Sequence, residues 1–298
     1  MHGYQDLERK VIELFNSIES LIWRGNTYSE IIATKPTTSS GECKTDVYVS
    51  LRENGIERDA IKITVKKDNA DFLANKLKDI DAENLLGTNW SSILVNSIAS
   101  IQQIFLQEPL IELKPKSSPT ELYIKLGWKL EVTNVARNLS VKLNLLPSEI
   151  IDYIYRGTNQ PIERIHAYVN GTRVMNSGVA DYILQGSSFH SVQHILDNLI
   201  LLEANSFIPP DTYLVFTANN YRLIRDSADG PRSLAIAIEW GLDSRNKLVP
   251  TINFAQPLVF TGQRDMMPIL KANLAQIGIT PDTFDETNIK NLRISDIY

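Results

Sequence analysis

The sequence predicts an α/β protein with a central mixed β-sheet, helices that flank this sheet, and a C-terminal α+β extension. Three observations support this prediction: an N-terminal stripe of apolar residues with helical spacing, a pair of alternating strands after it, and a succession of helix-like and strand-like segments through the rest of the chain. The 298 residues, 43% of them hydrophobic and 22% charged, are enough for one large domain or two smaller ones.

The first predicted element is an amphipathic helix over residues 6–22. Its apolar side chains recur at spacings of three and four residues, which places them on one face of a helix. They are Leu7, Val11, Leu14, Phe15, Ile18 and Ile22. A polar loop over residues 34–41, which contains Pro36 and several Ser and Thr residues, ends this first unit.

Two segments that alternate with period two, residues 46–51 and 60–66, predict a β-hairpin with one polar and one apolar face. A turn-like Glu-Asn-Gly run at residues 53–55 separates them. Residues two apart in a strand share a face, and the hairpin brings the start of the first strand beside the end of the second. We therefore expect Asp46 and Lys66 to meet at the same end of the hairpin.

The remaining segments follow both patterns. Helical spacing predicts helices over residues 70–86, 92–106, 148–155 and 190–202, and strand-like stretches lie within 121–143 and 213–260. Prolines and lysines cluster at residues 108–118, which marks a soft boundary, although one elaborated domain fits the sequence equally well.

Composition and motifs exclude several classes of protein. The single cysteine, Cys43, leaves no internal disulfide and no thiolate cluster for zinc. Neither of the glycine-rich motifs G-x-G-x-x-G and G-x-x-x-x-G-K-[ST] occurs, so we expect no nucleotide cofactor. The chain lacks an apolar run of about 18 residues and a secretory signal, so we expect a cytoplasmic protein without membrane contact. A net charge of −5 argues against indiscriminate nucleic-acid binding, but it allows a local basic cleft.

Asp46 and Lys66 are the residues that could carry chemistry. Hydrolysis of a phosphodiester uses a divalent ion that hard oxygen ligands hold, and Asp46 offers such a ligand. A nearby ammonium stabilises the negative charge of the transition state or orients the attacking water, and Lys66 offers this ammonium. The alternative for the two residues is a solvated cross-strand ion pair, worth less than about 1 kcal/mol.

Residues 41–49 (GECKTDVYV) and 61–67 (IKITVKK) together resemble the catalytic hairpin of the PD-(D/E)XK type II restriction endonucleases. Residues 7–21 (LERKVIELFNSIESL) resemble the N-terminal helix of an enzyme of that family, and its active-site glutamate falls on Glu8. The resemblance covers roughly residues 5–90.

The resemblance also implies how the metal is held. The family often has an acidic residue two positions before the catalytic lysine, where this sequence has Thr64. A hydroxyl is a poorer ligand than a carboxylate, so the resemblance implies that Glu8 supplies the second carboxylate. Other carboxylates that could do so are Glu19, Asp79 and Glu83. Glu8 alone could equally be an exposed acid that the helix dipole favours.

The family's fold and activity are therefore our main expectation. The resemblance implies a restriction-endonuclease-like fold, with residues 1–110 as catalytic core and 111–298 as the remainder of the core and the target-recognition region. It implies Mg²⁺-dependent cleavage of double-stranded DNA at a short specific sequence, leaving 5′-phosphate and 3′-hydroxyl ends, with Asp46 and Glu8 as metal ligands and Lys66 and Thr64 completing the site. It also implies a cognate DNA methyltransferase. A palindromic target would suit a homodimer, and a monomer is the alternative.

Two other functions fit the same sequence. One is a repair or recombination nuclease that cuts by DNA structure, and the other is a non-catalytic DNA-binding regulator with a helix-turn-helix over residues 138–157. His190 and His194 have the helical spacing of two metal ligands, but no third ligand is evident. Residues of the types that contact DNA are Lys114, Lys116, Lys125, Lys129, Arg137, Lys142, Arg222, Arg225, Arg232, Gln263 and Arg264.

Overall fold

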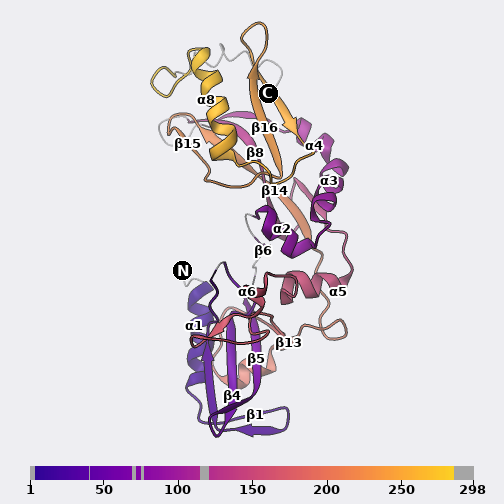
Figure 1. Cartoon of the computed structure of the whole chain (residues 1–298), viewed down its shortest axis with the longest axis vertical. Helices are drawn as coiled ribbons and strands as arrows, with labels where there is room; N and C mark the ends of the chain where they lie inside the picture. Colours follow the sequence, from indigo (N-terminus) through magenta and orange to yellow (C-terminus); the bar gives the residue numbers. More distant parts are fainter. Residues whose placement is uncertain (1–3, 40, 69–71, 75–76, 115–120, 285–298) are drawn as a thin grey trace. The chain divides into compact units, whose positions relative to one another are not determined.

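A computed structural model describes residues 4–39, 41–68, 72–74, 77–114 and 121–284. The chain divides into two compact units, each built from two separate stretches (Figure 1). Unit 1 comprises Met1–Leu73 and Asn144–Pro210, and unit 2 comprises Ala74–Leu143 and Asp211–Tyr298. The boundary expected near residue 110 lies within unit 2, and the chain passes between the units three times.

Unit 1 contains a mixed β-sheet with the strand order β13-β12-β5-β4-β3. All neighbouring strands are antiparallel except the pair β5 and β12, which is parallel. The elements of unit 1 are α1 (Tyr4–Asn16), β1 (Leu21–Trp23), β2 (Asn26–Tyr28), β3 (Glu30–Thr34), β4 (Val47–Glu53), β5 (Ile56–Lys66), α5 (Pro147–Glu149), the π-helix η1 (Ile150–Arg156), α6 (Ile162–Ile165), β10 (Tyr168–Val169), β11 (Thr172–Arg173), β12 (Tyr182–Gln185), α7 (Val192–Asp197) and β13 (Leu199–Leu201).

The predicted hairpin is confirmed as β4 and β5, at the centre of this sheet. Asn54 and Gly55 form its two-residue turn, both with positive φ (52° and 75°), as a turn that matches the twist of the strands requires. The register pairs Val47 with Ile63 and Val49 with Ile61, and all four side chains are buried in one core. The polar side chains of both strands therefore lie on the opposite face of the sheet.

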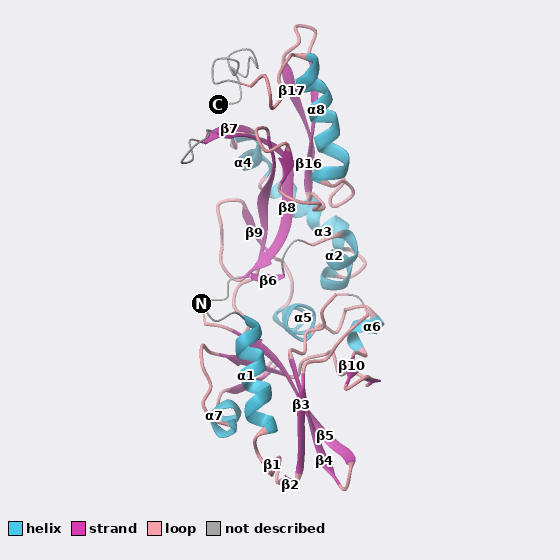
Figure 2. Ribbon diagram, turned by 90° about the vertical axis from the view of Figure 1, so that its left-hand side faces the viewer, coloured by secondary structure: helices cyan, strands magenta, loops and turns pink. Residues whose placement is uncertain are grey.

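Helix α1 covers the apolar face of the sheet. Leu7, Val11 and Phe15 are buried in the same core as the hairpin, and α7 lies on the same side (Figure 2). The predicted continuation of the helix to residue 22 is wrong beyond Asn16. The side chain of Asn16 exchanges two hydrogen bonds with the main chain of Ala33, a contact with another element that ends the helix.

Unit 2 contains an antiparallel sheet with the strand order β15-β14-β8-β16-β17, joined by β7 beside β8 and β9 beside β14. The rings of Phe105, Trp128 and Phe216 pack edge to face in its core. Its elements are α2 (Asp79–Leu86), α3 (Trp90–Ser100), α4 (Gln102–Gln107), β7 (Ile111–Lys114), β8 (Glu121–Thr133), β9 (Ser140–Lys142), β14 (Tyr213–Arg222), β15 (Ser227–Ala228), β16 (Ile236–Leu242), β17 (Leu248–Asn253), the π-helix η2 (Gly262–Met266) and α8 (Met267–Gln276); β6 (Phe72–Ala74) spans the division between the units.

Several predicted segments hold in part. The helix over 92–106 is confirmed with a break at Ile101, and that over 148–155 is confirmed as α5 and η1. The helix over 70–86 is confirmed only for α2, because β6 is a strand; residues 70, 71, 75 and 76 lie outside the described part. The helix predicted over 190–202 is confirmed for α7 and is wrong for the strand β13 that follows it.

The alternative of a helix-turn-helix over residues 138–157 is wrong. Ser140–Lys142 is the strand β9, whose pairing with β14 leaves no first helix for the motif. The described residues contain no helix that is long and apolar enough to cross a membrane.

Candidate active site

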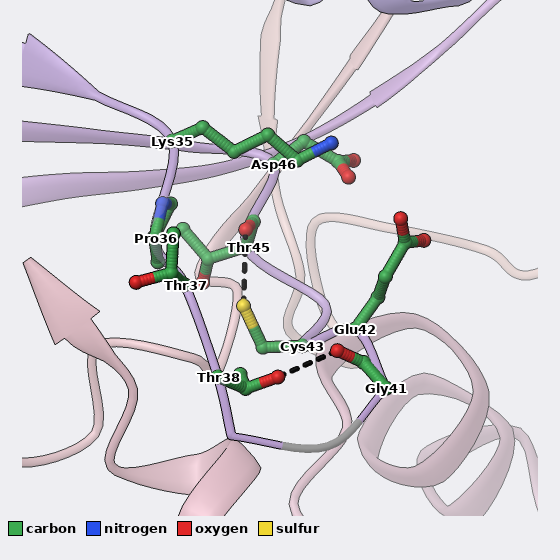
Figure 3. A pocket seen from close by; sticks show the side chains of 9 residues that line it. All are labelled: Lys35, Pro36, Thr37, Thr38, Gly41, Glu42, Cys43, Thr45 and Asp46. Atoms are coloured by element: carbon green, nitrogen blue, oxygen red, sulfur yellow. Dashed lines mark hydrogen bonds between the residues drawn. The ribbon is translucent and has the colours of Figure 1, made fainter.

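The sheet of unit 1 gathers polar groups at one end, where β3 and β5 finish and β4 begins. Asp46 directly precedes β4, and its N–H donates to the carbonyl of Ile63 at 2.9 Å. Lys35 directly follows β3, and Lys66 is the last residue of β5. A cavity of about 300 Å³ opens at this end, with Lys35, Glu42 and Asp46 in its wall (Figure 3).

Asp46 is held in place by the neighbouring strand. Its Oδ2 accepts hydrogen bonds from the Val65 N–H at 2.7 Å and from the Thr64 hydroxyl at 3.1 Å. Thr64 is almost fully buried, so both donors are fixed by the packing of β5. The other carboxylate oxygen, Oδ1, receives no hydrogen bond from the described residues and remains available to a ligand.

Glu8 reaches the same end of the sheet from α1 and forms an ion pair with Lys35. Lys35 Nζ lies 2.6 Å from Glu8 Oε2, and the Glu8 side chain is 13% exposed while that of Lys35 is 41% exposed. Burial raises the pKa of Glu8, as do the charges of Asp46 and Glu42, while Lys35 opposes them. Burial lowers the pKa of Lys35, but the hydrogen bond and charge of Glu8 outweigh it, so this pKa is raised.

These oxygens fit a hard divalent cation. Asp46 and Glu8 each keep one carboxylate oxygen that accepts no hydrogen bond from the described residues, and Glu42 adds negative charge nearby. Mg²⁺ is commonly bound by one or two carboxylates, with waters and substrate phosphate completing its shell. Within the part of the chain that is described, no group of three or more His, Cys, Asp and Glu side chains is placed to hold a metal. A magnesium site here would thus rest on two carboxylates.

Two lysines supply positive charge beside Asp46. Lys66 lies on the polar face of β5, and no carboxylate among the described residues is within ion-pair distance of its ammonium. Lys44 is half-buried, and burial together with the charge of Lys66 lowers its pKa to about 8, against the opposing charge of Asp46. The site therefore contains a second amine that the sequence analysis did not single out.

A loop from the second stretch of unit 1 positions the segment that contains Lys44. The carbonyl of Gly178 accepts hydrogen bonds from the N–H groups of Lys44 and Thr45, at 3.0 and 3.2 Å. A Cβ on Gly178 would lie 1.7 Å from the Arg164 carbonyl oxygen, so only glycine allows this approach. The stem of Lys44 packs on Gly157, where a Cβ would lie 2.5 Å from the lysine Cγ.

Of the predicted site residues, Asp46, Thr64, Lys66 and Glu8 come together at this end of the sheet. Glu19, one of the alternative carboxylates, lies beyond the end of α1 and is exposed, so it does not share a helix face with Glu8. Asp79 and Glu83 are exposed residues of α2 in unit 2.

His190 and His194 stack on each other with ring centroids 5.8 Å apart, and His190 precedes α7 instead of lying on it. Several cations suggested for DNA contact are paired with carboxylates: Lys125 with Glu108, Lys142 with Asp211, Arg222 with Asp229, Arg225 with Glu121 and Arg264 with Asp265. Lys116 lies outside the described residues.

Lys35, Glu42 and Lys44 are members of the site that were not predicted from the sequence. Glu42 and Lys44 lie in the segment that resembles the family hairpin. Their closeness to Asp46 along the chain could have identified them as neighbours of the site. Lys35 lies in a segment that was predicted only as a polar loop. Neither this prediction nor the neighbouring Pro36 indicates which residue the Lys35 side chain contacts.

Comparison with known proteins gives no match: no family model, no curated protein and no solved structure matches this chain.

Proposed function

We propose that this protein is a Mg²⁺-dependent type II restriction endonuclease of the PD-(D/E)XK family, whose hairpin and first helix resemble those of the MspI restriction endonuclease. The observation that carries the proposal is the meeting of Asp46, Thr64 and Lys66 at one end of a central hairpin, with the Glu8 carboxylate beside them. A mixed sheet with this hairpin at its centre and helices packed on it is also the core that the resemblance implies.

Each residue has a distinct role in the proposed reaction. Asp46 and Glu8 would hold Mg²⁺, which supplies polarisation of the phosphate and acidification of water. Thr64 keeps the Asp46 carboxylate oriented through its hydroxyl, because its proton is donated to Asp46 Oδ2. The Lys66 ammonium, which no carboxylate neutralises among the described residues, stabilises the negative charge that develops on the phosphate.

The substrate and partners follow from this activity. We propose double-stranded DNA cut at a short specific sequence, with 5′-phosphate and 3′-hydroxyl products, a homodimer on a palindromic site, and a cognate DNA methyltransferase that protects the host. Unit 2 is then the candidate target-recognition region.

Incubation of the purified protein with one sequenced plasmid tests the proposal. We expect discrete fragments with Mg²⁺, no cleavage with EDTA, and no cleavage by Asp46→Asn. Asp59→Asn, which changes another carboxylate of the hairpin, is the control and should cut like the wild type. A smear or junction-dependent nicking would favour a structure-directed nuclease, and DNA binding without any metal-dependent cleavage would refute the enzyme assignment.

A further inference from the structure

We propose that Lys35 is a built-in counterion of the metal site, which a divalent cation must displace from Glu8 before it can bind. The proposal rests on the proposed function, because it takes Asp46 and Glu8 as the metal ligands. It adds a positioning residue that neither the sequence motif nor the resemblance assigns.

The Lys35 ammonium lies close to several carboxylates of the site. It lies 2.6 Å from Glu8 Oε2 and also interacts electrostatically with Asp46 and Glu42. Figure 3 shows the Lys35 side chain extended toward Asp46, with its nitrogen next to the Asp46 carboxylate. The ammonium thus lies among the carboxylates that would hold the metal.

A bound divalent cation and the Lys35 ammonium would occupy neighbouring positions at one site. A divalent ion bound by Glu8 and Asp46 would be close to the Lys35 ammonium, and like charges repel strongly where burial limits screening. Glu8 is mostly buried, so water screens this repulsion poorly on its side. The ion pair and the bound metal therefore compete for the same negative charge.

The Lys35 side chain can leave Glu8 without a change in the backbone. The backbones on both sides are fixed, because α1 is anchored in the core and β3 pairs with β4 up to Thr34. The Lys35 side chain is 41% exposed and its four-carbon stem is flexible, so the ammonium can swing into the open cavity without moving a strand. Metal binding then requires a side-chain rotation and leaves the fold unchanged.

Titration with Mn²⁺ alone, by calorimetry and without DNA, tests the inference. The proteins are wild type, Lys35→Met, Lys35→Arg, Lys10→Met and Asp46→Asn. Lys35→Met keeps the stem and removes the charge, whereas Lys35→Arg keeps the charge. Lys10 is exposed on α1 two residues from Glu8 and faces away from it, so Lys10→Met controls for net charge.

We expect Lys35→Met to bind Mn²⁺ roughly tenfold more tightly than wild type, as the loss of a charged hydrogen-bond competitor implies. Lys35→Arg and Lys10→Met should stay within about twofold of wild type, well inside that difference. Unchanged or weaker binding by Lys35→Met, or an equal gain in Lys10→Met, would overturn the inference while leaving the metal site intact. Binding that Asp46→Asn does not weaken, or no binding by any protein, would instead remove the metal site itself and the inference with it. Thermal unfolding of each variant checks that the fold is retained.

Discussion

Replacing Lys44 by methionine removes a charge from a half-buried position and keeps an unbranched stem of similar length. The charged amine is disfavoured there by burial and by the nearby Lys66, and these effects lower its pKa from 10.5 to about 8 despite the opposing charge of Asp46. Methionine can keep the packing of the stem on Gly157 without an ammonium. We therefore expect Lys44→Met to be more stable than the wild type at neutral pH.

The size and pH dependence of this gain follow from the lowered pKa. Each pKa unit corresponds to about 1.4 kcal/mol, so the full shift would correspond to about 3 kcal/mol, and partial solvent contact reduces this to about 2 kcal/mol. Below pH 8 the wild type carries the whole penalty, because the amine is charged in both the folded and the unfolded chain. As the pH rises from about 8 to 10.5, the folded protein has lost its proton while the unfolded chain still holds it, so the wild type regains stability.

Urea unfolding at pH 7 and at pH 10, monitored by the rate at which the Cys43 thiol is labelled, measures the free energy of unfolding of unit 1. Cys43 reports on this unit because it is the single cysteine of the chain and adjoins Lys44. The stability advantage of Lys44→Met should be largest at pH 7 and shrink toward pH 10. Its cleavage rate should fall roughly tenfold, since one positive charge is lost beside the reacting phosphate. An advantage that is absent at pH 7, or equal at both pH values, would refute this account of Lys44.

Three further predictions concern the proposed catalytic groups. Asp46→Asn should lower the cleavage rate by roughly a thousandfold or more while DNA binding, measured by fluorescence anisotropy, is retained. Lys66→Ala should be similarly inactive in plasmid cleavage, whereas Lys67→Ala, just past the end of β5, should cut at a rate near that of the wild type; equal losses would contradict the strand register. Glu8→Ala should shift the Mg²⁺ midpoint of cleavage upward, with partial recovery at high Mg²⁺, and Glu19→Ala should not; a shift in Glu19→Ala alone would exclude Glu8 as the ligand.

The hairpin was predictable because its determinants are local. Alternation along both strands and the Asn54-Gly55 turn predict the hairpin itself. The register also depends on a bulge beside Leu51, which was not predicted and which brings Asp46 opposite Thr64. The helical stripe likewise identified the buried face of α1. The position of Glu8 beside Asp46 required the resemblance as well, since periodicity says nothing about which strand end a helix faces.

The errors have their cause in contacts between distant residues. The end of α1 depends on hydrogen bonds between Asn16 and Ala33, which no helical spacing reveals. Lys35 joins the site only through its ion pair with a residue of another element, Glu8. The division into interleaved units depends on where the chain returns after residue 143, and composition near residue 110 contains no information about that return.

The carbonyl of Gly178 has a consequence for any shortened form of this protein. A fragment that ends at residue 110 contains every proposed catalytic residue, but it lacks the acceptor for Lys44 and Thr45 and the strand β12 that pairs with β5. In this fragment β5 would be an edge strand with unpaired main-chain N–H and C=O groups. Such an edge favours aggregation of the chains, so we expect the fragment not to form the folded site. During synthesis, the proposed nuclease would thus acquire its active geometry only after the ribosome has passed β12, and unfinished chains would not yet be able to cut the DNA of the cell that makes them.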